Sequence, residues 1–412
     1  MRRFAPLAAK ITLLVAVCAM MIAFIEIALR LVRIATPSWY HMDNVMGYAL
    51  RPHAEGWHRD EGMNFVRISS EGLHDDEHSL QKPAGTLRIA VLGDSFTEAF
   101  QVSLPEAFWS VMRQEIAMCE GDFSIESINF GVGGYGTAQE LLMLRNRVWL
   151  YDPDIVLLAF FAGNDIRNNS STLEGDLLRP YFTVRGTTLT EDLSFLRDPT
   201  FIRQSSVLRT AWASVVNHSR FLQGVSLLWH TAEGFVRARF EGKPIAFKHD
   251  NTPAAQEGWS EAGIPEWSFL PPSDASTRDA WAVTEALILE MNQEVSAHGK
   301  RFAMIVFSSA ISVHPDPSVR AQFASSIGAP SLTYTEDRIV RFAKDHGIPA
   351  LPLTKPLLPY AEQSKQFLHS FNGTGKGHWN TLGHRIVGEL TGRFLCEEVL
   401  ATNNKLRNGV SP

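Results

Sequence analysis

Ser95 and His378 occupy places in this chain of 412 residues that suit nucleophilic chemistry. Ser95 follows an apolar run at residues 87–92 and the turn-forming Gly93, so we expect its hydroxyl in a tight turn where a strand meets a helix. His378 stands just ahead of a final segment with helical periodicity. An imidazole can take the proton of a serine hydroxyl, and the oxygen can then attack an ester carbonyl. The pair therefore predicts acyl transfer, with Ser95 as the nucleophile and His378 as the base.

Two further segments offer hydrogen-bond donors for the oxyanion of a tetrahedral intermediate. Gly134 lies in a glycine-rich run after a second apolar stretch, and Asn164 follows a third. The Gly134 N–H has no side chain in its way, and Asn164 has a side-chain amide. Together with the Ser95 N–H, these groups are expected to form the oxyanion hole. Asp94 and Asp165 are interpreted as braces for their loops.

Apolar runs and helical segments alternate along the chain in a pattern typical of a parallel sheet with covering helices. Buried strands are expected at residues 87–92 and 155–161 and further strands at 123–130, 301–308 and about 349–353. Capping boxes are expected at 103–106 and 137–140. We therefore predict a three-layer α/β/α domain of the flavodoxin-like class. Open parallel sheets place their sites at the carboxyl ends of the strands, where the candidate residues fall.

Four sequence blocks occur in order at these predicted strand ends. They read Gly-Asp-Ser, Gly-x-Gly-Gly-x-Gly-Thr, Gly-Asn-Asp and His-Trp-Asn-x-x-Gly-His. The set resembles the SGNH, or GDSL, hydrolase family over residues 86–165 and 365–400. The resemblance implies a serine esterase that needs no cofactor and acts on a short acyl ester of a carbohydrate or lipid. It implies a nucleophile at Ser95, a base at His378 and oxyanion donors at Gly134 and Asn164.

One position departs from that family's pattern. The family usually has an aspartate three residues before the histidine, where this chain has Gly375, and residues 363–388 contain no carboxylate. The group that orients His378 must be a backbone carbonyl, a distant acid, or nothing. Loss of the acid from such a triad can cost about 10⁴ in turnover. Two alternatives stay open: an O-acyltransferase acting on an exported polysaccharide, and a non-catalytic glycan-binding relative.

The N-terminus, residues 1–33, is interpreted as a membrane anchor. Residues 11–25 carry no charge, follow Arg2, Arg3 and Lys10, and with the next few residues are about long enough to span a bilayer. Positive charges ahead of the span favour a cytoplasmic N-terminus. We expect a single-pass protein of a bacterial cytoplasmic membrane with its catalytic domain outside the cytoplasm. A cleaved signal peptide is the alternative.

The remaining sequence divides by pattern into further parts. They are a lead-in at 34–85, a hydrolase-like domain at 86–400 with an insertion at about 166–277, and a tail at 401–412. The lead-in looks irregular, apart from a strand-like alternation at 64–69. The insertion lacks the strand–helix rhythm and is helical in pattern at 204–229. It either shapes the substrate site or forms a passive cap.

Several classes of partner are disfavoured. The formal net charge is -6 with no long basic run, which argues against nucleic acid. No His or Cys pair has the spacing of a metal site. Residues 131–136 match the dinucleotide fingerprint G-x-G-x-x-G, but the next strand ends in neutral residues where an acid is needed. Cys119 and Cys396 fall near the ends of two predicted helices, and they are either a disulfide or two separate thiols.

Overall fold

A five-stranded parallel sheet forms the centre of the molecule, in the order β11-β10-β7-β5-β6. The computed structural model describes residues 5–401 except 120, 122, 187 and 242–263. The strands are β5 (Thr86–Gly93), β6 (Ser124–Asn129), β7 (Ile155–Phe161), β10 (Arg301–Phe307) and β11 (Ala350–Pro352). Renumbered in chain order, the sheet reads 2-1-3-4-5, which is the flavodoxin-like arrangement. The predicted fold class and all five predicted strands are confirmed.

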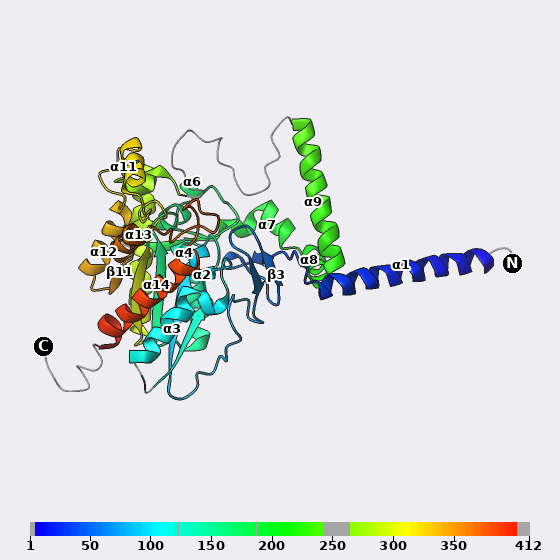
Figure 1. Ribbon diagram of the computed structural model, residues 1–412, viewed down its shortest axis with the longest axis horizontal. Helices are drawn as coiled ribbons and strands as arrows, with labels where there is room; N and C mark the ends of the chain where they lie inside the picture. The colour runs from blue at the N-terminus through cyan, green and yellow to red at the C-terminus, as the bar shows by residue number, and fades with distance from the viewer. Residues whose placement is uncertain (1–4, 120, 122, 187, 242–263, 402–412) are drawn as a thin grey trace.

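Helices cover both faces of this sheet (Figure 1). One layer consists of α3 (Phe108–Cys119), α13 (Thr354–Ser364) and α14 (Thr381–Phe394), and the other of α4 (Thr137–Asn146), α10 (Ala275–Ala297) and α12 (Tyr334–Asp345). Successive side chains of a strand point to opposite faces. Accordingly, Ile89 and Val91 pack with the first layer, and Ala90 and Leu92 with the second. All four are at most 1% exposed, so the strand is buried on both faces and reads as one apolar run.

Further helices complete the main domain and its insertion. They are α2 (Ser95–Glu98), α5 (Asp165–Asn168), α6 (Ser171–Glu174), α7 (Pro199–Gln204), α8 (Val207–His218), α9 (Arg220–Glu241) and α11 (Pro317–Ser326), with 3₁₀ turns η1 (Leu104–Glu106), η2 (Val148–Tyr151), η3 (Ser194–Arg197) and η4 (Glu266–Phe269) and a π-helical turn η5 (Leu395–Leu400). The insertion also contains the hairpin of β8 (Tyr181–Arg185) and β9 (Thr188–Asp192).

The two capping-box predictions had different outcomes. The capping box at Ser103–Glu106 is present. It caps the start of the 3₁₀ turn η1, however, and α3 begins only at Phe108. The box at residues 137–140 is wrong, because Gly136 is the N-cap and Glu140 is buried inside the domain. The N–H of Ala138 at this helix start donates instead to the side chain of Asn169, at 2.9 Å. A neighbouring loop thus satisfies the helix end from outside.

The lead-in at 34–85 is more ordered than its sequence suggested. It contains four strands in two antiparallel hairpins, β1 (Tyr40–Asp43) with β2 (Gly47–Leu50) and β3 (Glu55–His58) with β4 (Asn64–Arg67). The predicted strand at 64–69 corresponds to β4. The Asp75 carboxylate accepts the backbone N–H of Asn129, at 2.8 Å, where β6 ends. The lead-in therefore packs against the carboxyl ends of the strands, where the candidate site is predicted.

The N-terminal helix α1 (Ala5–Leu31) projects away from the folded body (Figure 1). Within the described residues, it is the one helix long and apolar enough to cross a membrane. Its segment Ala9–Leu31 has a mean hydropathy of 2.6, and none of that segment is buried.

Cys119 at the end of α3 and Cys396 in η5 form a disulfide. Their Cα atoms lie 6.4 Å apart, within the usual range for this bond, and 277 residues separate them along the chain. The bond ties together two helices of the same layer, so the question that the sequence left open is settled in favour of pairing.

We expect Cys119→Ser to lower the free energy of unfolding by about 2 to 5 kcal/mol, because a cross-link over a long loop restricts the unfolded chain. Urea unfolding of the purified protein measures this loss. Cys18→Ser is the matched control, since Cys18 is unpaired and exposed on α1. Equal stability of the two variants would contradict a stabilising bond.

Candidate active site

Ser95 lies at the first position of α2, directly after β5. The Asp94 carboxylate caps this one-turn helix by accepting the N–H of Phe96, at 2.9 Å. The turn is tight enough that a Cβ on Gly93 would meet the hydroxyl of Thr97 at 2.2 Å. Ser95 is partly exposed between buried neighbours, so the fold presents its hydroxyl at the rim of the sheet.

His378 reaches this hydroxyl from a loop 283 residues further along the chain, with 2.8 Å between its Nε2 and Ser95 Oγ. The loop runs into α14, whose N-cap Asn380 accepts the N–H of Gly383 at 3.0 Å. Phe96 packs against the imidazole, with ring centroids 4.8 Å apart. The contact expected from the sequence is therefore present.

A third residue, Glu61, completes the arrangement, and sequence reasoning did not identify it. Its carboxylate contacts His378 Nδ1 and accepts the His378 backbone N–H at 3.3 Å. Burial raises the pKa of Glu61, but the hydrogen bonds and charge of His378 outweigh it and hold the pKa below its ordinary value. A carboxylate at Nδ1 fixes the proton there and leaves Nε2 as the acceptor for the serine proton.

Glu61 lies in the loop between β3 and β4, so the lead-in supplies the acid. Gly375, at the family's usual acid position, has φ +70° and stands so close to Phe367 that a Cβ would lie 2.6 Å from its ring. Gly377 has φ +91°, and a Cβ there would lie 1.8 Å from Glu61 Oε1. Glycine at 377 thus leaves the space that the distant carboxylate occupies. The one signal in the sequence was negative, namely the absence of a carboxylate across 363–388.

We expect Gly377→Ala to lower kcat/KM for an ester by about 10²-fold, because misplacement of a catalytic group by about 1 Å can cost this much. Gly347→Ala is the matched control. Gly347 has a similar φ of +67°, but a Cβ there meets nothing within 4 Å. Steady-state kinetics of both variants separates displacement of Glu61 from backbone strain. Equal losses in both would mean that Glu61 is not displaced.

The expected oxyanion donors follow three neighbouring strands, β7, β5 and β6. Asn164 Nδ2 donates one hydrogen bond to Asp94 Oδ2, at 3.1 Å, which orients the amide and leaves its second hydrogen available. Gly134 has φ +78°, and its carbonyl accepts from Asn168 Nδ2 at 3.0 Å. Ser95, Gly134 and Asn164 are all partly exposed.

The loop that carries Gly134 is held by Glu98 and by two tyrosines of the lead-in. The N–H of Gly133 donates to Glu98 Oε1 at 2.9 Å, and its carbonyl accepts from the Tyr48 hydroxyl at 2.9 Å. Tyr40 donates its hydroxyl to the same Glu98 carboxylate at 2.9 Å. A carboxylate therefore occupies the place where a dinucleotide site would present this N–H to a pyrophosphate.

Four buried acids, Asp94, Glu98, Glu140 and Asp165, lie beneath the site. Asp165 accepts the Phe161 N–H at 2.7 Å, so it braces the loop after β7. Burial raises the pKa of Glu98 from its ordinary value of 4.5 to about 7, against the pull of its hydrogen bonds. Burial also raises the pKa values of Glu140 and Asp165, and the two carboxyls repel each other.

A raised pKa means that the folded protein binds the Glu98 proton more tightly than the unfolded chain does. Stability from this group is therefore complete below about pH 4.5 and is lost as the pH rises through about 7. We expect Glu98→Gln to reduce the pH dependence of the unfolding free energy between pH 5 and 7 by up to about 1.4 kcal/mol per pH unit. Urea unfolding at several pH values tests this, with exposed Glu191→Gln as control. An unchanged slope in Glu98→Gln would contradict the raised pKa.

Comparisons with known proteins give matches in structure alone. No family model matches the chain, and no curated protein matches it. An acetyl xylan esterase is 11% identical, with a TM-score of 0.36 over 74% of this chain and 96% of that one. A lipase/acylhydrolase from Enterococcus faecalis is 15% identical, with a TM-score of 0.36 over 75% and 95% of the two chains. A GDSL-like lipase from Bacteroides thetaiotaomicron is 13% identical, with a TM-score of 0.32 over 76% and 88%.

The architecture follows from the sheet order and from the positions of the motif blocks. Three of the four blocks follow β5, β6 and β7 at the same edge of the sheet. The fourth block brings His378 to Ser95. By its topology the chain has a flavodoxin-like three-layer α/β/α fold, and its motif blocks lie where the resemblance to the SGNH hydrolases predicts them.

Proposed function

We propose that this protein is a serine esterase. His378 takes the proton of Ser95 while Ser95 Oγ attacks the carbonyl carbon of an acyl ester. The resulting oxyanion binds the N–H groups of Ser95 and Gly134 and the amide of Asn164. The bond to the leaving alcohol then breaks, and His378 returns its proton to that alkoxide. A water molecule, deprotonated by His378, then attacks the acyl-enzyme. As the bond to Ser95 Oγ breaks, His378 returns that proton to Ser95, and the carboxylic acid leaves.

The hydrogen-bonded chain from Ser95 through His378 to Glu61 carries this proposal. The main reason to suspect a non-catalytic glycan binder was the missing acid at Gly375. Glu61 supplies that acid from another part of the chain. During attack, its negative charge stabilises the imidazolium that forms on His378.

A short acyl group is proposed from the resemblance of the motif blocks to those of the SGNH hydrolases. We expect the purified protein to hydrolyse a nitrophenyl acetate faster than the corresponding octanoate. The reverse preference would contradict a short acyl group.

Hydrolysis and transfer to another hydroxyl share every step up to the acyl-enzyme. The assay that separates them follows a labelled acetyl group in the presence of increasing amounts of a saccharide. We expect free acetate to account for the turnover at every saccharide concentration. Accumulation of acetylated saccharide at the expense of acetate would instead assign an acyltransferase. The carrier of the natural acyl group is proposed to be a carbohydrate or lipid, from the resemblance of the motif blocks.

We further propose that α1 anchors the domain on the outer side of a bacterial cytoplasmic membrane. Its apolar, unburied length supports a span, and the disulfide between Cys119 and Cys396 fits an oxidising compartment outside the cytoplasm. Protease treatment of intact spheroplasts tests this topology. The domain should be digested without lysis and leave a membrane-embedded fragment. Protection of the whole chain, or release of an uncut soluble domain, would contradict the anchor.

A further inference from the structure

Helices α8 and α9 of the insertion each expose several large apolar side chains. On α8, Leu208 is 84% and Trp212 is 62% exposed, four residues apart. On α9, Leu228 and Trp229 are each 71% exposed, with Val225 three residues before Leu228. Spacings of three and four residues place such side chains on one side of a helix. Apolar patches of this kind mark interaction surfaces.

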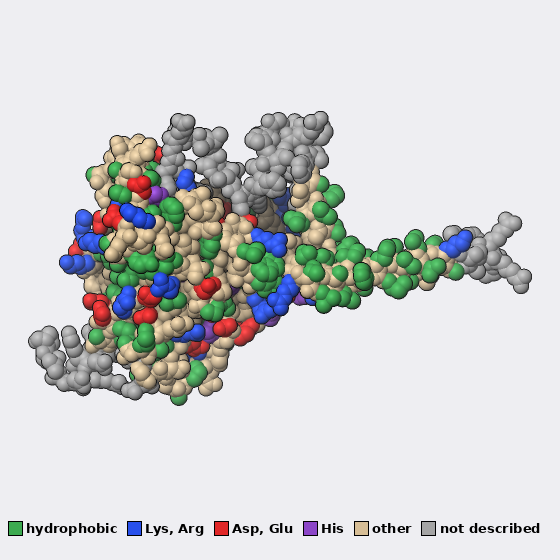
Figure 2. Space-filling model, viewed as in Figure 1, with side chains coloured by type: hydrophobic (Ala, Val, Ile, Leu, Met, Phe, Trp, Pro, Cys, Tyr) green, Lys and Arg blue, Asp and Glu red, His purple; other side chains and the backbone are tan. Residues whose placement is uncertain are grey.

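These helices adjoin the end of α1 that is nearer the folded body. α9 contacts α1 and runs crosswise to it (Figure 1). Hydrophobic side chains continue from α1 onto the side of α9 that is turned away from the folded body (Figure 2). The apolar surface of the insertion is therefore continuous with that of the proposed membrane span.

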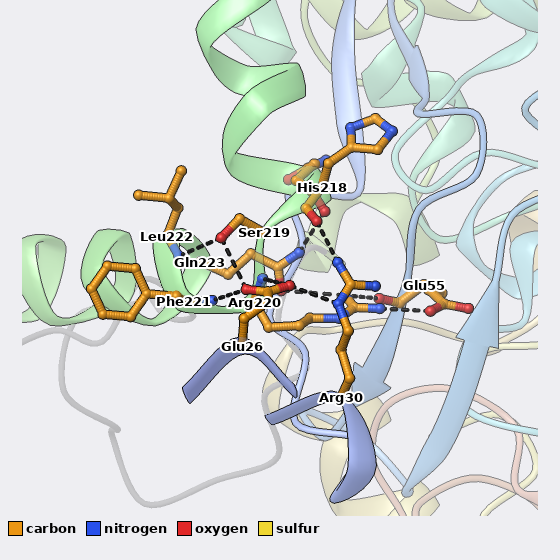
Figure 3. A network of polar contacts seen from close by, with 10 residues as sticks. Glu26, Arg30, Glu55, His218, Ser219, Arg220, Phe221, Leu222 and Gln223 are labelled. Carbon is orange, nitrogen blue, oxygen red and sulfur yellow. Dashed lines mark hydrogen bonds and ion pairs between the residues drawn. The ribbon is translucent and has the colours of Figure 1, made fainter. Parts of the chain in front are cut away.

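A polar joint holds the two helices in this orientation (Figure 3). The Glu26 carboxylate of α1 accepts the backbone N–H groups of Arg220 and Phe221 at 3.1 and 2.9 Å, and the Ser219 hydroxyl at 3.0 Å. It thus caps the N-terminus of α9, and Arg30 donates to it from one turn further along α1, at 2.7 Å. These contacts satisfy the Glu26 carboxylate within a mostly apolar helix, and they fix the direction of α9.

The joint falls where the hydrocarbon of a bilayer would end. The 27 residues of α1 extend about 40 Å, whereas a hydrocarbon core is about 30 Å thick. Glu26 is the first charged residue after the uncharged stretch at 11–25, so it lies near the boundary on the exported side. A helix that starts at this depth and runs crosswise to the span must lie along the membrane surface.

Positive charge surrounds the same joint. A recess beside it is lined by four arginines, Arg30, Arg33, Arg67 and Arg220, and by one acid, Glu55. Arg220 is paired with Glu55 at 2.6 Å, and Arg67 lies 3.5 Å from the same carboxylate. The four arginines outnumber the two acids, Glu55 and Glu26, so this rim carries net positive charge. Phosphate groups of lipid head groups suit such a rim.

We propose that α8 and α9 lie in the interface of the bilayer that α1 spans, with Trp212 and Trp229 at the level of the head groups. The inference rests on the proposed anchoring by α1. Tryptophan favours this depth because its ring is apolar and its N–H is polar. The occupant of the apolar face is the lipid surface, and the arginine rim favours anionic lipid. The insertion then holds the catalytic domain in one orientation above the membrane.

Nitroxide labels on single cysteines test this in proteoliposomes of the full chain. The variants are Trp212→Cys and Leu228→Cys, each with Cys18→Ser. Leu150→Cys, also with Cys18→Ser, is the matched control, because Leu150 is also apolar and 58% exposed but lies in η2, on the main domain. The native Cys18 of α1, labelled in a fourth sample, reports on the span itself. Hydrolysis of a soluble aryl acetate shows that each variant is folded.

Labels at 212, 228 and 18 should collide with oxygen, which partitions into lipid, more than with a polar nickel chelate. The label at 150 should show the opposite preference. Labels at 212 and 228 that behave like the one at 150, while Cys18 lies in lipid, would overturn the inference and leave the anchor intact. A nickel-accessible Cys18 would refute the anchor itself. Added phosphatidylglycerol should move the 228 label deeper, and no change would contradict a role for the arginine rim.

Discussion

Replacement of Glu61 by glutamine is expected to lower kcat for ester hydrolysis by about 10³- to 10⁴-fold. The Glu61 carboxylate contacts His378 Nδ1, and the opposite ring nitrogen lies 2.8 Å from Ser95 Oγ. A glutamine amide can donate to Nδ1 and so favour the tautomer whose proton sits on Nε2. That tautomer cannot accept the serine proton. The glutamine variant also lacks the negative charge that stabilises the imidazolium in the transition state. The loss should therefore fall on kcat more than on KM.

Glu61→Asp distinguishes a need for the negative charge at residue 61 from a need for its side-chain length. The shorter carboxylate keeps the charge, so it should retain more activity than the glutamine variant, which keeps the length. Exposed Glu71→Gln, also in the lead-in, controls for a general effect of lost charge and should leave kcat unchanged. If Glu61→Gln and Glu71→Gln had equal, near-normal kcat, another group would orient His378.

Replacement of Ser95 by alanine is expected to lower kcat about 10⁶-fold. The substitution deletes the oxygen that forms the acyl-enzyme but leaves the backbone N–H of residue 95 in place. A residual rate above that of water is expected from the oxyanion donors alone. Nitrophenyl acetate hydrolysis at high enzyme concentration measures both values.

Because Ser95, His378 and Glu61 act as one unit, their losses should not add. Adding Glu61→Gln to Ser95→Ala is expected to change the residual rate by much less than it changes the wild-type rate. Exposed Ser79→Ala is the control for the loss of a hydroxyl. Additive losses would show that Glu61 does not act through Ser95 and His378.

The three central strands, β5, β7 and β10, were predictable because they are buried on both faces. Such strands read as continuous apolar runs, and Ile155–Phe161 matches the expected run residue for residue. Helix α13 was not predicted, because Pro359 lies inside it and a proline normally ends a helical pattern. The supposed capping role of Glu140 failed for a different reason. A capping box is a local pattern, and Asn169 from another loop took over the helix start.

The site was predictable where chemistry follows a strand, since parallel strands bring their carboxyl ends together. That rule led to Ser95, Gly134 and Asn164. It could not lead to Glu61, because this residue lies 317 positions from His378 in a hairpin loop with no motif of its own. Its role depends on how the lead-in packs, and also on the space left at Gly377. The pairing of Cys119 with Cys396 likewise depended on how two helices meet.

The central claim is that His378 and Glu61 together activate Ser95. Its most direct test is labelling with a serine-reactive fluorophosphonate, followed by peptide mapping and a comparison of labelling rates. One adduct should form, on the peptide that contains Ser95, and Glu61→Gln should slow its formation by orders of magnitude. An adduct on another residue, or a Glu61→Gln protein modified as fast as the wild type, would contradict this account of the site.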